Sequence, residues 1–307
     1  MTPFVQPRAL RPGDRVAVVA ASSPANQVKL DGGLRALRAA GLEPDVFPSA
    51  RATGTEYDYL AGDDRLRAED FTAAMADPGY AAVFLACGGY GAQRTLELVD
   101  WSRIDPGRPR AVIGYSDVTA LLEAIAVKLG WVSFYGPNLA TDATHEGAGS
   151  YAYDQLMKTL TGGVTELSFP DARTITPGVA EGVTVGGCAS LLAASIGSDT
   201  SLPAKGAILF LEDVDELLFR LDRILTQLRR ASYSDGVAGV LLGTFTECGD
   251  PRDVERLLVD RFADLGVPVL AGADIGHNVP TQTLPLGVPA RLDTDSGTLT
   301  LLKPPVS

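Results

Sequence analysis

The stretch AVIGYSDVTALLEAI, residues 111–125, begins as a buried strand and continues as an amphipathic helix, with Ser116 at the junction. A serine before an apolar-periodic helix is most often an N-cap, because its oxygen accepts a hydrogen bond from an unpaired amide. The alternative is a nucleophile held at the strand end, where the helix N-terminus offers amides to a developing oxyanion. The G-x-S-x-G signature of a nucleophile elbow is incomplete, since Val118 occupies the second glycine position. The local pattern therefore leaves both interpretations open.

Strands and helices alternate through the first half of the chain on both sides of this stretch. Short apolar runs alternate with segments of helical period, which predicts an α/β fold with a parallel sheet covered on both faces. The predicted strands are 15–22, 42–48, 81–87, 111–115 and 132–137, and the predicted helices are 27–41, 63–77, 88–100 and 117–130.

The pattern weakens after residue 138 and resumes near residue 181. One helix, 153–162, and a weakly patterned connection precede a glycine-rich stretch at 181–200. Strands are then predicted at 206–214, 237–245 and 267–273, a helix at 215–231, and a closing strand pair around a D-S-G turn. We expect an N-terminal domain over 1–150, a linker over 151–180 and a C-terminal α/β domain over 181–307.

The composition excludes several classes of protein. The 307 residues include 38 acidic and 26 basic side chains, a formal charge of −12, which argues against a nucleic-acid partner. No apolar window is long enough to span a membrane, and the N-terminal stretch lacks the charged and apolar regions of a signal peptide. Three widely spaced cysteines fit neither a disulfide framework nor a zinc site. We expect a reduced, cytoplasmic protein without a metal or another cofactor.

A serine nucleophile needs a base, and the chain has two histidines, His145 and His277. His145 lies in a polar loop that we expect to be solvated, whereas His277 follows a predicted strand, where catalytic residues of such sheets gather. Glu212 and Asp213 end the apolar strand 206–214, and neighbouring strand residues face opposite sides. One carboxylate can therefore orient the histidine while the other caps the helix 215–231; alternatively, both serve that helix.

A glycine-rich turn follows the strand 81–87. The sequence ACGGYGAQR, residues 86–94, lacks the lysine of a phosphate-binding loop, so its amides are better suited to forming half of an oxyanion hole. Cys87 ends an apolar run, and a buried, unreactive thiol is the favoured interpretation over a nucleophile.

Several sequence blocks together resemble the LD-carboxypeptidase family of serine peptidases, which includes muropeptide LD-carboxypeptidases and microcin-immunity peptidases. The blocks include LRPGDRVAVVAASSP, GGYGAQRTLELVDW, IGYSDVTALL, GAILFLEDVDELLFRLDRIL and GHNVPTQTLPLGVPARLD, in family order over almost the whole chain. The resemblance implies an N-terminal flavodoxin-like domain and a β-rich C-terminal domain with the active site between them. It also implies a homodimer that needs no metal.

The resemblance assigns a catalytic triad. It implies that Ser116 is the nucleophile, Glu212 the acid and His277 the base. The oxyanion hole would use the backbone amide of Asp117 with one from the Gly88–Gly89 turn. We add Tyr90, Tyr115 and Arg94 as candidate substrate contacts.

Two positions depart from the family pattern. Cys87 stands where the family often has arginine, and Tyr135 where similar proteins often carry histidine. The first departure puts recognition of a substrate carboxylate in doubt. Arg94, Arg220 and Arg223 are possible replacement cations, although surface ion pairs are the alternative for each.

The resemblance implies hydrolysis of an L,D-peptide bond, releasing the terminal D-Ala of a cytoplasmic murein tetrapeptide during cell-wall recycling. One alternative is an immunity-type peptidase that cleaves peptidyl or aminoacyl nucleotides; the short chain and the lack of tryptophan after residue 131 favour murein. Another alternative is a catalytically silent ligand-binding homologue.

Overall fold

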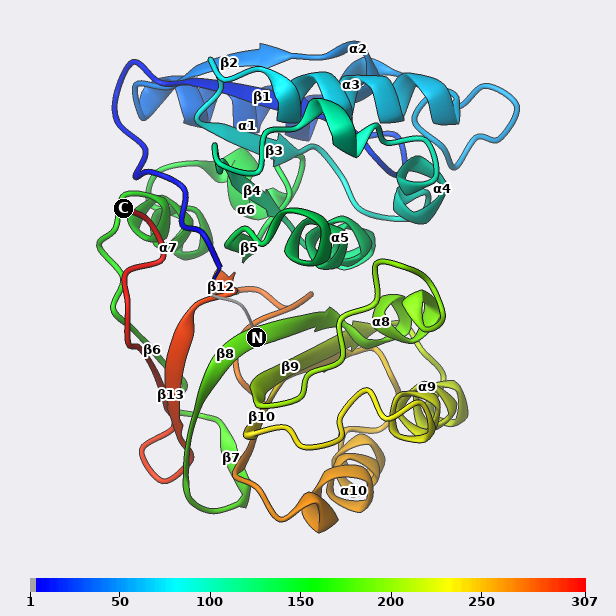
Figure 1. Ribbon diagram of the computed structural model, residues 1–307, viewed down its shortest axis with the longest axis vertical. Coiled ribbons are helices and arrows are strands. Elements are labelled where there is room, and N and C mark those ends of the chain that lie inside the picture. Colours follow the sequence, from blue (N-terminus) through cyan, green and yellow to red (C-terminus); the bar gives the residue numbers. More distant parts are fainter. Residues whose placement is uncertain (1–3) are drawn as a thin grey trace.

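The computed structural model describes residues 4–307, and its strands form two sheets. The first sheet and its helices fill the upper half of Figure 1, and the second sheet with α8, α9 and α10 fills the lower half. Residues 1–3, which begin the stretch searched for a signal peptide, lie outside this description. No helix within residues 4–307 has both the length and the apolar character needed to cross a bilayer.

The first sheet has six strands in the order β12-β5-β4-β3-β1-β2. All neighbours are parallel except β12, which pairs antiparallel with β5. The order β2-β1-β3-β4-β5 is that of flavodoxin-like folds, so the predicted parallel domain is confirmed. The strands are β1 (Arg15–Val19), β2 (Glu43–Val46), β3 (Ala82–Leu85), β4 (Ala111–Gly114), β5 (Ser133–Tyr135) and β12 (Leu284–Leu286).

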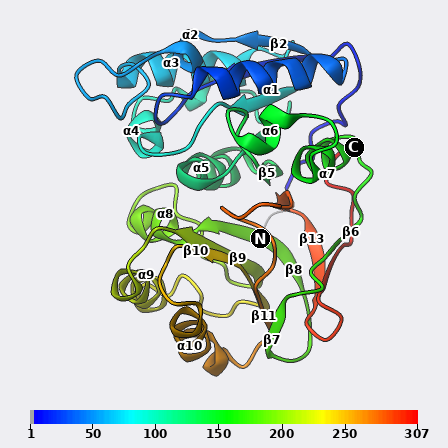
Figure 2. The same ribbon diagram turned by 180° about the vertical axis from the view of Figure 1, so that it is seen from behind.

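Helices cover both faces of this sheet. One set of contacts joins α1 to α6 and α6 to α7, and another joins α3 to α4 and α4 to α5. Figure 1 shows α3, α4 and α5 toward the viewer, and Figure 2 shows α1, α6 and α7 from the other side. These elements are α1 (Gln27–Ala39), α2 (Pro48–Arg51), α3 (Asp64–Ala76), α4 (Ala92–Leu96), α5 (Thr119–Leu129), α6 (Asp142–Glu146) and α7 (Tyr151–Leu160), with 3₁₀ turns η1 (Trp101–Arg103) and η2 (Ser116–Val118).

The second sheet has eight strands in the order β6-β14-β13-β8-β9-β10-β11-β7. Its centre, β8 to β11, is parallel, while the outer strands pair antiparallel. The strands are β6 (Glu166–Ser168), β7 (Arg173–Thr176), β8 (Val179–Cys188), β9 (Ala207–Val214), β10 (Gly239–Thr246), β11 (Val269–Ala271), β13 (Pro289–Asp293) and β14 (Thr298–Leu301), and the helices are α8 (Ala189–Ser195), α9 (Leu218–Arg230) and α10 (Pro251–Phe262), followed by η3 (Ala263–Leu265).

Alternation along β9 separates two cores. Ile208 and Phe210 join the larger core shared with the first sheet, whereas Leu209 and Leu211 join a second core with α8, α9 and α10. Because strand residues alternate, Glu212 continues the face that looks toward the first sheet. This arrangement directs one of the two adjacent carboxylates into the space between the layers.

The glycine-rich stretch at 181–200 was not predicted as a strand, yet its first part belongs to β8, the longest strand of the second sheet. The connection around residue 173 likewise forms β7 at one edge of that sheet, and β6 lies at the other edge. Within 151–180 the structure thus places α7, β6 and β7, whereas β12 returns from the C-terminal part to the first sheet. The boundaries at 150 and 180 stay a prediction.

Candidate active site

Ser116 follows β4 after a single residue and starts the turn η2. Its φ of 65° lies in the left-handed region, which is unusual for a residue with a side chain and is concentrated at functional sites. Helix α5 begins at Thr119 with no side-chain cap, and among residues 4–307 no hydrogen bond engages the Ser116 hydroxyl. The structure therefore does not support the helix-cap interpretation of Ser116.

The turn after β3 packs directly against this serine. A Cβ added at Gly88 would lie 2.9 Å from Ser116 Cβ and 3.1 Å from Ser116 Oγ, so the close approach requires glycine. Gly89 has a φ of 97°, and Ser23, after β1, donates its amide to Gly88 O at 3.1 Å and accepts from Tyr90 N at 3.0 Å. The turn is therefore anchored at the switch point of the sheet, where such folds bind ligands.

Asp117 holds the same turn from the other side. Its buried carboxylate accepts a hydrogen bond of 2.8 Å from Ala92 N, at the start of α4, and burial raises the pKa of this carboxyl. The backbone amides of Gly89 and Asp117 donate to no protein acceptor in the part of the chain that the structure describes. Amides that are held in place and unpaired are the kind of donor that an oxyanion hole requires.

Glu212, at the end of β9, is 0% exposed and has a partner at each oxygen. Tyr135 Oη donates to Oε1 at 2.6 Å, and His277 Nδ1 lies 2.7 Å from Oε2. Asp213 faces the other way and accepts from Ser190 N at 2.9 Å in the first turn of α8. The two carboxylates do diverge, but the expected cap on the helix 215–231 is wrong, because Asp213 caps α8.

His277 lies in the loop after β11 with its side chain 14% exposed. Its ring is tilted against that of Tyr115, with the ring centroids 4.8 Å apart. Gly276 has a φ of 133°, and a Cβ there would come 2.5 Å from Glu212 Oε2, so only glycine lets the loop approach the carboxylate. With Glu212 ionised, Nδ1 donates to it, which leaves Nε2 as the proton acceptor.

Ser116 and His277 are brought into one site without a direct hydrogen bond between their side chains within residues 4–307. Ser116 N donates to Tyr135 Oη at 3.2 Å, and Tyr135 and His277 share Glu212. Catalytic hydrogen bonds of this type often tighten only in the substrate complex.

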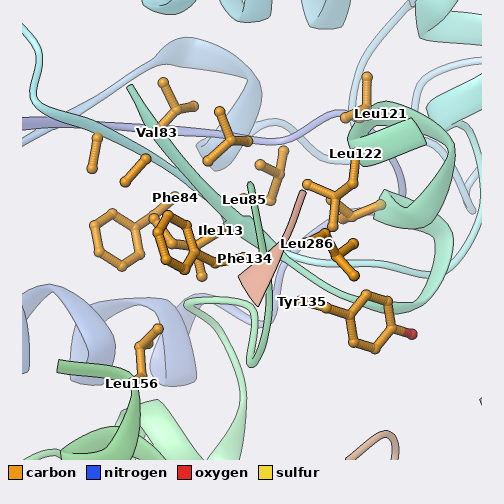
Figure 3. Close-up of a cluster of buried hydrophobic side chains, with 14 of the residues drawn as sticks. Val83, Phe84, Leu85, Ile113, Leu121, Leu122, Phe134, Tyr135, Leu156 and Leu286 are labelled. Atoms are coloured by element: carbon orange, nitrogen blue, oxygen red, sulfur yellow. The ribbon is translucent and has the colours of Figure 1, made fainter. Parts of the chain in front are cut away.

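Tyr135 was predicted only as a family departure and not as a site residue. The signal was the alternation of side chains along β5: Phe134 pairs with Ile113 of β4, which in turn pairs with Phe84 of β3, so Tyr135 must face the other side of the sheet. Figure 3 shows its ring apart from those residues, with the hydroxyl oxygen directed away from them.

The three candidate substrate contacts differ in their surroundings. Tyr115 packs on His277, and burial raises its pKa to about 12, whereas Tyr90 is half exposed beside the glycine turn. Arg94 donates to both oxygens of Asp64, at 2.6 to 3.0 Å, which is the ion pair named as its alternative. A role for these residues in substrate binding stays a prediction.

The other candidates lie as follows. Arg220 is exposed on α9, and Arg223 stacks over the Phe219 ring.

His145 is not in a solvated loop as expected. It lies on α6 and packs against Gly32 of α1, where any Cβ on residue 32 would collide with the His145 ring. Burial raises the pKa of the Cys87 thiol, which disfavours the thiolate. Within residues 4–307 no three His, Cys, Asp or Glu side chains are grouped to hold a metal.

Comparison with known proteins matches both parts of the chain to one family. The LD-carboxypeptidase N-terminal domain profile matches residues 16–136, and the C-terminal domain profile matches 181–292. A Streptomyces coelicolor protein assigned as a carboxypeptidase is 45% identical over 306 residues, covering 99% of this chain and 98% of its own. A Bacillus subtilis protein assigned as a murein peptide carboxypeptidase is 35% identical over 94% of this chain and 92% of its own.

Solved structures extend the likeness to the whole fold. The microcin C7 self-immunity protein in its wild-type apo state superposes with a TM-score of 0.89 at 25% identity, covering 99% of this chain and 100% of that one. Muramoyltetrapeptide carboxypeptidase from Oxalobacter formigenes gives a TM-score of 0.82 at 25% identity, covering 94% and 97%. These matches confirm the predicted two-part α/β fold, and the chain belongs to the LD-carboxypeptidase family of peptidases.

Proposed function

We propose that this protein is a serine LD-carboxypeptidase in which Ser116, His277 and Glu212 act as nucleophile, base and acid. The observation that carries the proposal is the Glu212–His277 hydrogen bond, 2.7 Å long, beside a strand-end serine whose hydroxyl bonds to no protein group within residues 4–307. A buried carboxylate on Nδ1 selects the tautomer whose Nε2 can take a proton.

The reaction has two halves. His277 Nε2 takes the Ser116 hydroxyl proton as Oγ attacks the peptide carbonyl, and the oxyanion develops against the amides of Asp117 and the Gly88–Gly89 turn. The imidazolium, stabilised by Glu212, then gives its proton to the departing amino group. His277 takes a proton from water as the water attacks the acyl-enzyme, and it returns this proton to Ser116 Oγ as the ester bond breaks and the shortened peptide leaves.

The substrate that we propose is a murein tetrapeptide, which loses its terminal D-Ala in the cytoplasm during cell-wall recycling. The support is the relatives: a murein tetrapeptide carboxypeptidase of Pseudomonas aeruginosa is 32% identical over 91% of this chain. The microcin C7 self-immunity protein of Escherichia coli is 27% identical over 94%. The homodimer stays a prediction, which sedimentation of the purified protein tests.

The second candidate substrate is an aminoacyl nucleotide. It is favoured by the TM-score of 0.88 to the microcin C7 self-immunity protein in complex with aspartyl sulfamoyl adenosine. The third candidate, a silent ligand-binding homologue, would hydrolyse neither substrate.

Mass spectrometry after incubation with each substrate separates these candidates. We expect release of D-Ala from the tetrapeptide and no cleavage of aspartyl sulfamoyl adenosine. Cleavage of the nucleotide alone would move the assignment to the immunity type. Cleavage of neither, with folded protein, would contradict both peptidase assignments.

A further inference from the structure

Tyr135 forms the one hydrogen-bonded link that the described residues provide between the backbone of Ser116 and Glu212. Its ring is 1% exposed and packs edge-on against Phe210 at 5.2 Å and against Tyr115 at 6.3 Å. Its hydroxyl donates to Glu212 Oε1 at 2.6 Å and accepts from Ser116 N at 3.2 Å. The donor and one acceptor position of this hydroxyl are therefore both used inside the site.

The donation to Glu212 carries the larger energetic weight. An O–H bond to a carboxylate is charge-assisted, and 2.6 Å is a length typical of such bonds. Glu212 is 0% exposed, so no bulk water replaces a lost donor at Oε1. The other oxygen faces His277, so the two donors share one negative charge.

The hydrogen bond that Tyr135 accepts from Ser116 N restrains the backbone at Ser116. Ser116 has a left-handed φ of 65°, a conformation that persists only where its surroundings hold it. The Ser116 amide is held by Tyr135, while the neighbouring Asp117 amide has no protein acceptor within residues 4–307. The hydrogen bond to Tyr135 thus uses the Ser116 amide to hold the turn, while the Asp117 amide stays available to donate to an oxyanion.

We propose that Tyr135 is a positioning residue of the proposed hydrolase: its hydroxyl orients Glu212, holds the Ser116 turn and limits the negative charge that Glu212 presents to His277. This inference rests on the proposed function, since it needs a reactive Ser116 and a basic His277. It goes further in assigning the proton-transfer properties of the site to a residue outside the triad.

The sign of the effect follows from the charge on Glu212. A hydrogen bond from Tyr135 stabilises the carboxylate and draws its charge toward Oε1. Without that bond more of the charge acts on His277 through Oε2, which stabilises the charged imidazolium relative to the neutral ring. The acidic limb of any activity that requires neutral His277 then moves to higher pH.

Other titratable groups lie near this network and are unchanged in every variant. Burial raises the pKa of Tyr115 and of Cys188, while Asp213 and Cys248, whose pKa burial also raises, lie on the other side of β9. A difference between wild type and a Tyr135 variant therefore reports the missing hydroxyl.

The test uses Tyr135→Phe in the full chain, with Tyr233→Phe as a matched control. Tyr233 is also buried and also donates to a buried glutamate, Glu123 Oε1, at 2.9 Å. The readout is the second-order rate of fluorophosphonate labelling of Ser116 between pH 5 and 9. For Tyr135→Phe we expect a fall of roughly 10- to 100-fold and an acidic inflection at least about half a pH unit higher. The control should keep the wild-type rate and inflection.

Replacing Tyr135 with 3-fluorotyrosine should shift the acidic inflection of the labelling rate in the opposite direction, and it keeps the hydroxyl. Its more acidic phenol is a stronger donor to Glu212, so the inflection should move to lower pH. This second variant keeps the test valid if loss of the hydroxyl unfolds the chain.

Three results would overturn the inference. They are labelling within threefold of wild type for Tyr135→Phe, a slower rate with an unshifted inflection, and equal shifts for Tyr233→Phe. Labelling needs no natural substrate, so labelled protein that leaves the tetrapeptide intact would refute the substrate and not the role of Tyr135. Wild-type protein that resists labelling would overturn both.

Discussion

Within residues 4–307, two buried tyrosine–glutamate pairs join the layers of the molecule, and in only one of them does the second glutamate oxygen bind another side chain. In the first, Tyr135 and His277 each bind one oxygen of Glu212. In the second, Tyr233 and the amide of Leu202 both bind Oε1 of Glu123 on α5, while Oε2 has no hydrogen-bond partner in residues 4–307.

The comparison shows that burial does not distinguish a candidate catalytic carboxylate from a structural one. Both glutamates are less than 10% exposed, and both tyrosines have a pKa raised well above the ordinary value by burial. The difference is that Glu212 orients a side chain that can exchange a proton, whereas Glu123 clamps α5 to the segment around residues 202 and 233. Four substitutions test this distinction.

The largest contrast should come from replacing each glutamate with glutamine. Glu212→Gln presents an amide donor or a neutral acceptor to His277 Nδ1, which disturbs the tautomer, and kcat/KM should fall about 10⁴-fold. Glu123→Gln should leave kcat/KM within about twofold, because Glu123 accepts its hydrogen bonds from Leu202 N and Tyr233 Oη, which lie outside the proposed site. Steady-state kinetics on the tetrapeptide measure both. Comparable losses of kcat/KM in the two variants would contradict the distinction between a catalytic Glu212 and a structural Glu123.

A smaller effect should follow from crowding Glu212 without changing its chemistry. In Gly276→Ala the new Cβ would come 2.5 Å from Glu212 Oε2 and 2.6 Å from Thr244 Oγ1, so the loop must move and kcat/KM should fall roughly 100-fold. The matched control is Gly197→Ala, which also has a positive φ, 91°, but nothing within 4 Å of its added Cβ.

Gly197→Ala should lose about 1 kcal/mol of stability through backbone strain and keep its activity. Kinetics together with urea unfolding separate the two effects. If Gly276→Ala is as active as the control, the close approach of the loop to Glu212 is not needed for function.

The smallest effect is the contribution of Glu123 to the pH dependence of stability. Burial raises the pKa of Glu123 above the ordinary glutamate value of 4.5, so the folded chain binds this proton more tightly than the unfolded chain. The stabilisation is present below pH 4.5 and is lost as pH rises through the folded pKa.

The free energy of unfolding of Glu123→Gln should therefore exceed that of wild type by about 1 kcal/mol between pH 5 and 8, since the substitution removes a buried and partly unpaired charge. Urea midpoints across this range measure the gain. If the urea midpoints of Glu123→Gln and wild type differed by the same amount at every pH, protonation of Glu123 would not be linked to folding.

Much of the first sheet could be predicted, because its strands are continuous apolar runs separated by helices of clear period. The same periodicity rule placed Glu212 and Asp213 on opposite faces of β9, which the hydrogen bonds confirm. The proximity of Glu212 and His277 followed from strand ends and from the family resemblance.

The rest depended on contacts that no local pattern encodes. Strand β8 was missed because Gly186 and Gly187 weaken its signal, yet a Cβ at Gly187 would press on the Thr119 side chain. The cap that Asp213 provides to α8, and the link from Tyr135 to Ser116, join segments that are far apart in the sequence.

The central claim is that Ser116 is the activated nucleophile of this site. The most direct test is fluorophosphonate labelling followed by peptide mass spectrometry, with Ser116→Ala as the control and unfolding curves for both proteins. We predict one adduct per chain on the peptide containing Ser116, and none in the folded variant. An adduct on another residue, or no adduct on folded wild-type protein, would contradict the claim.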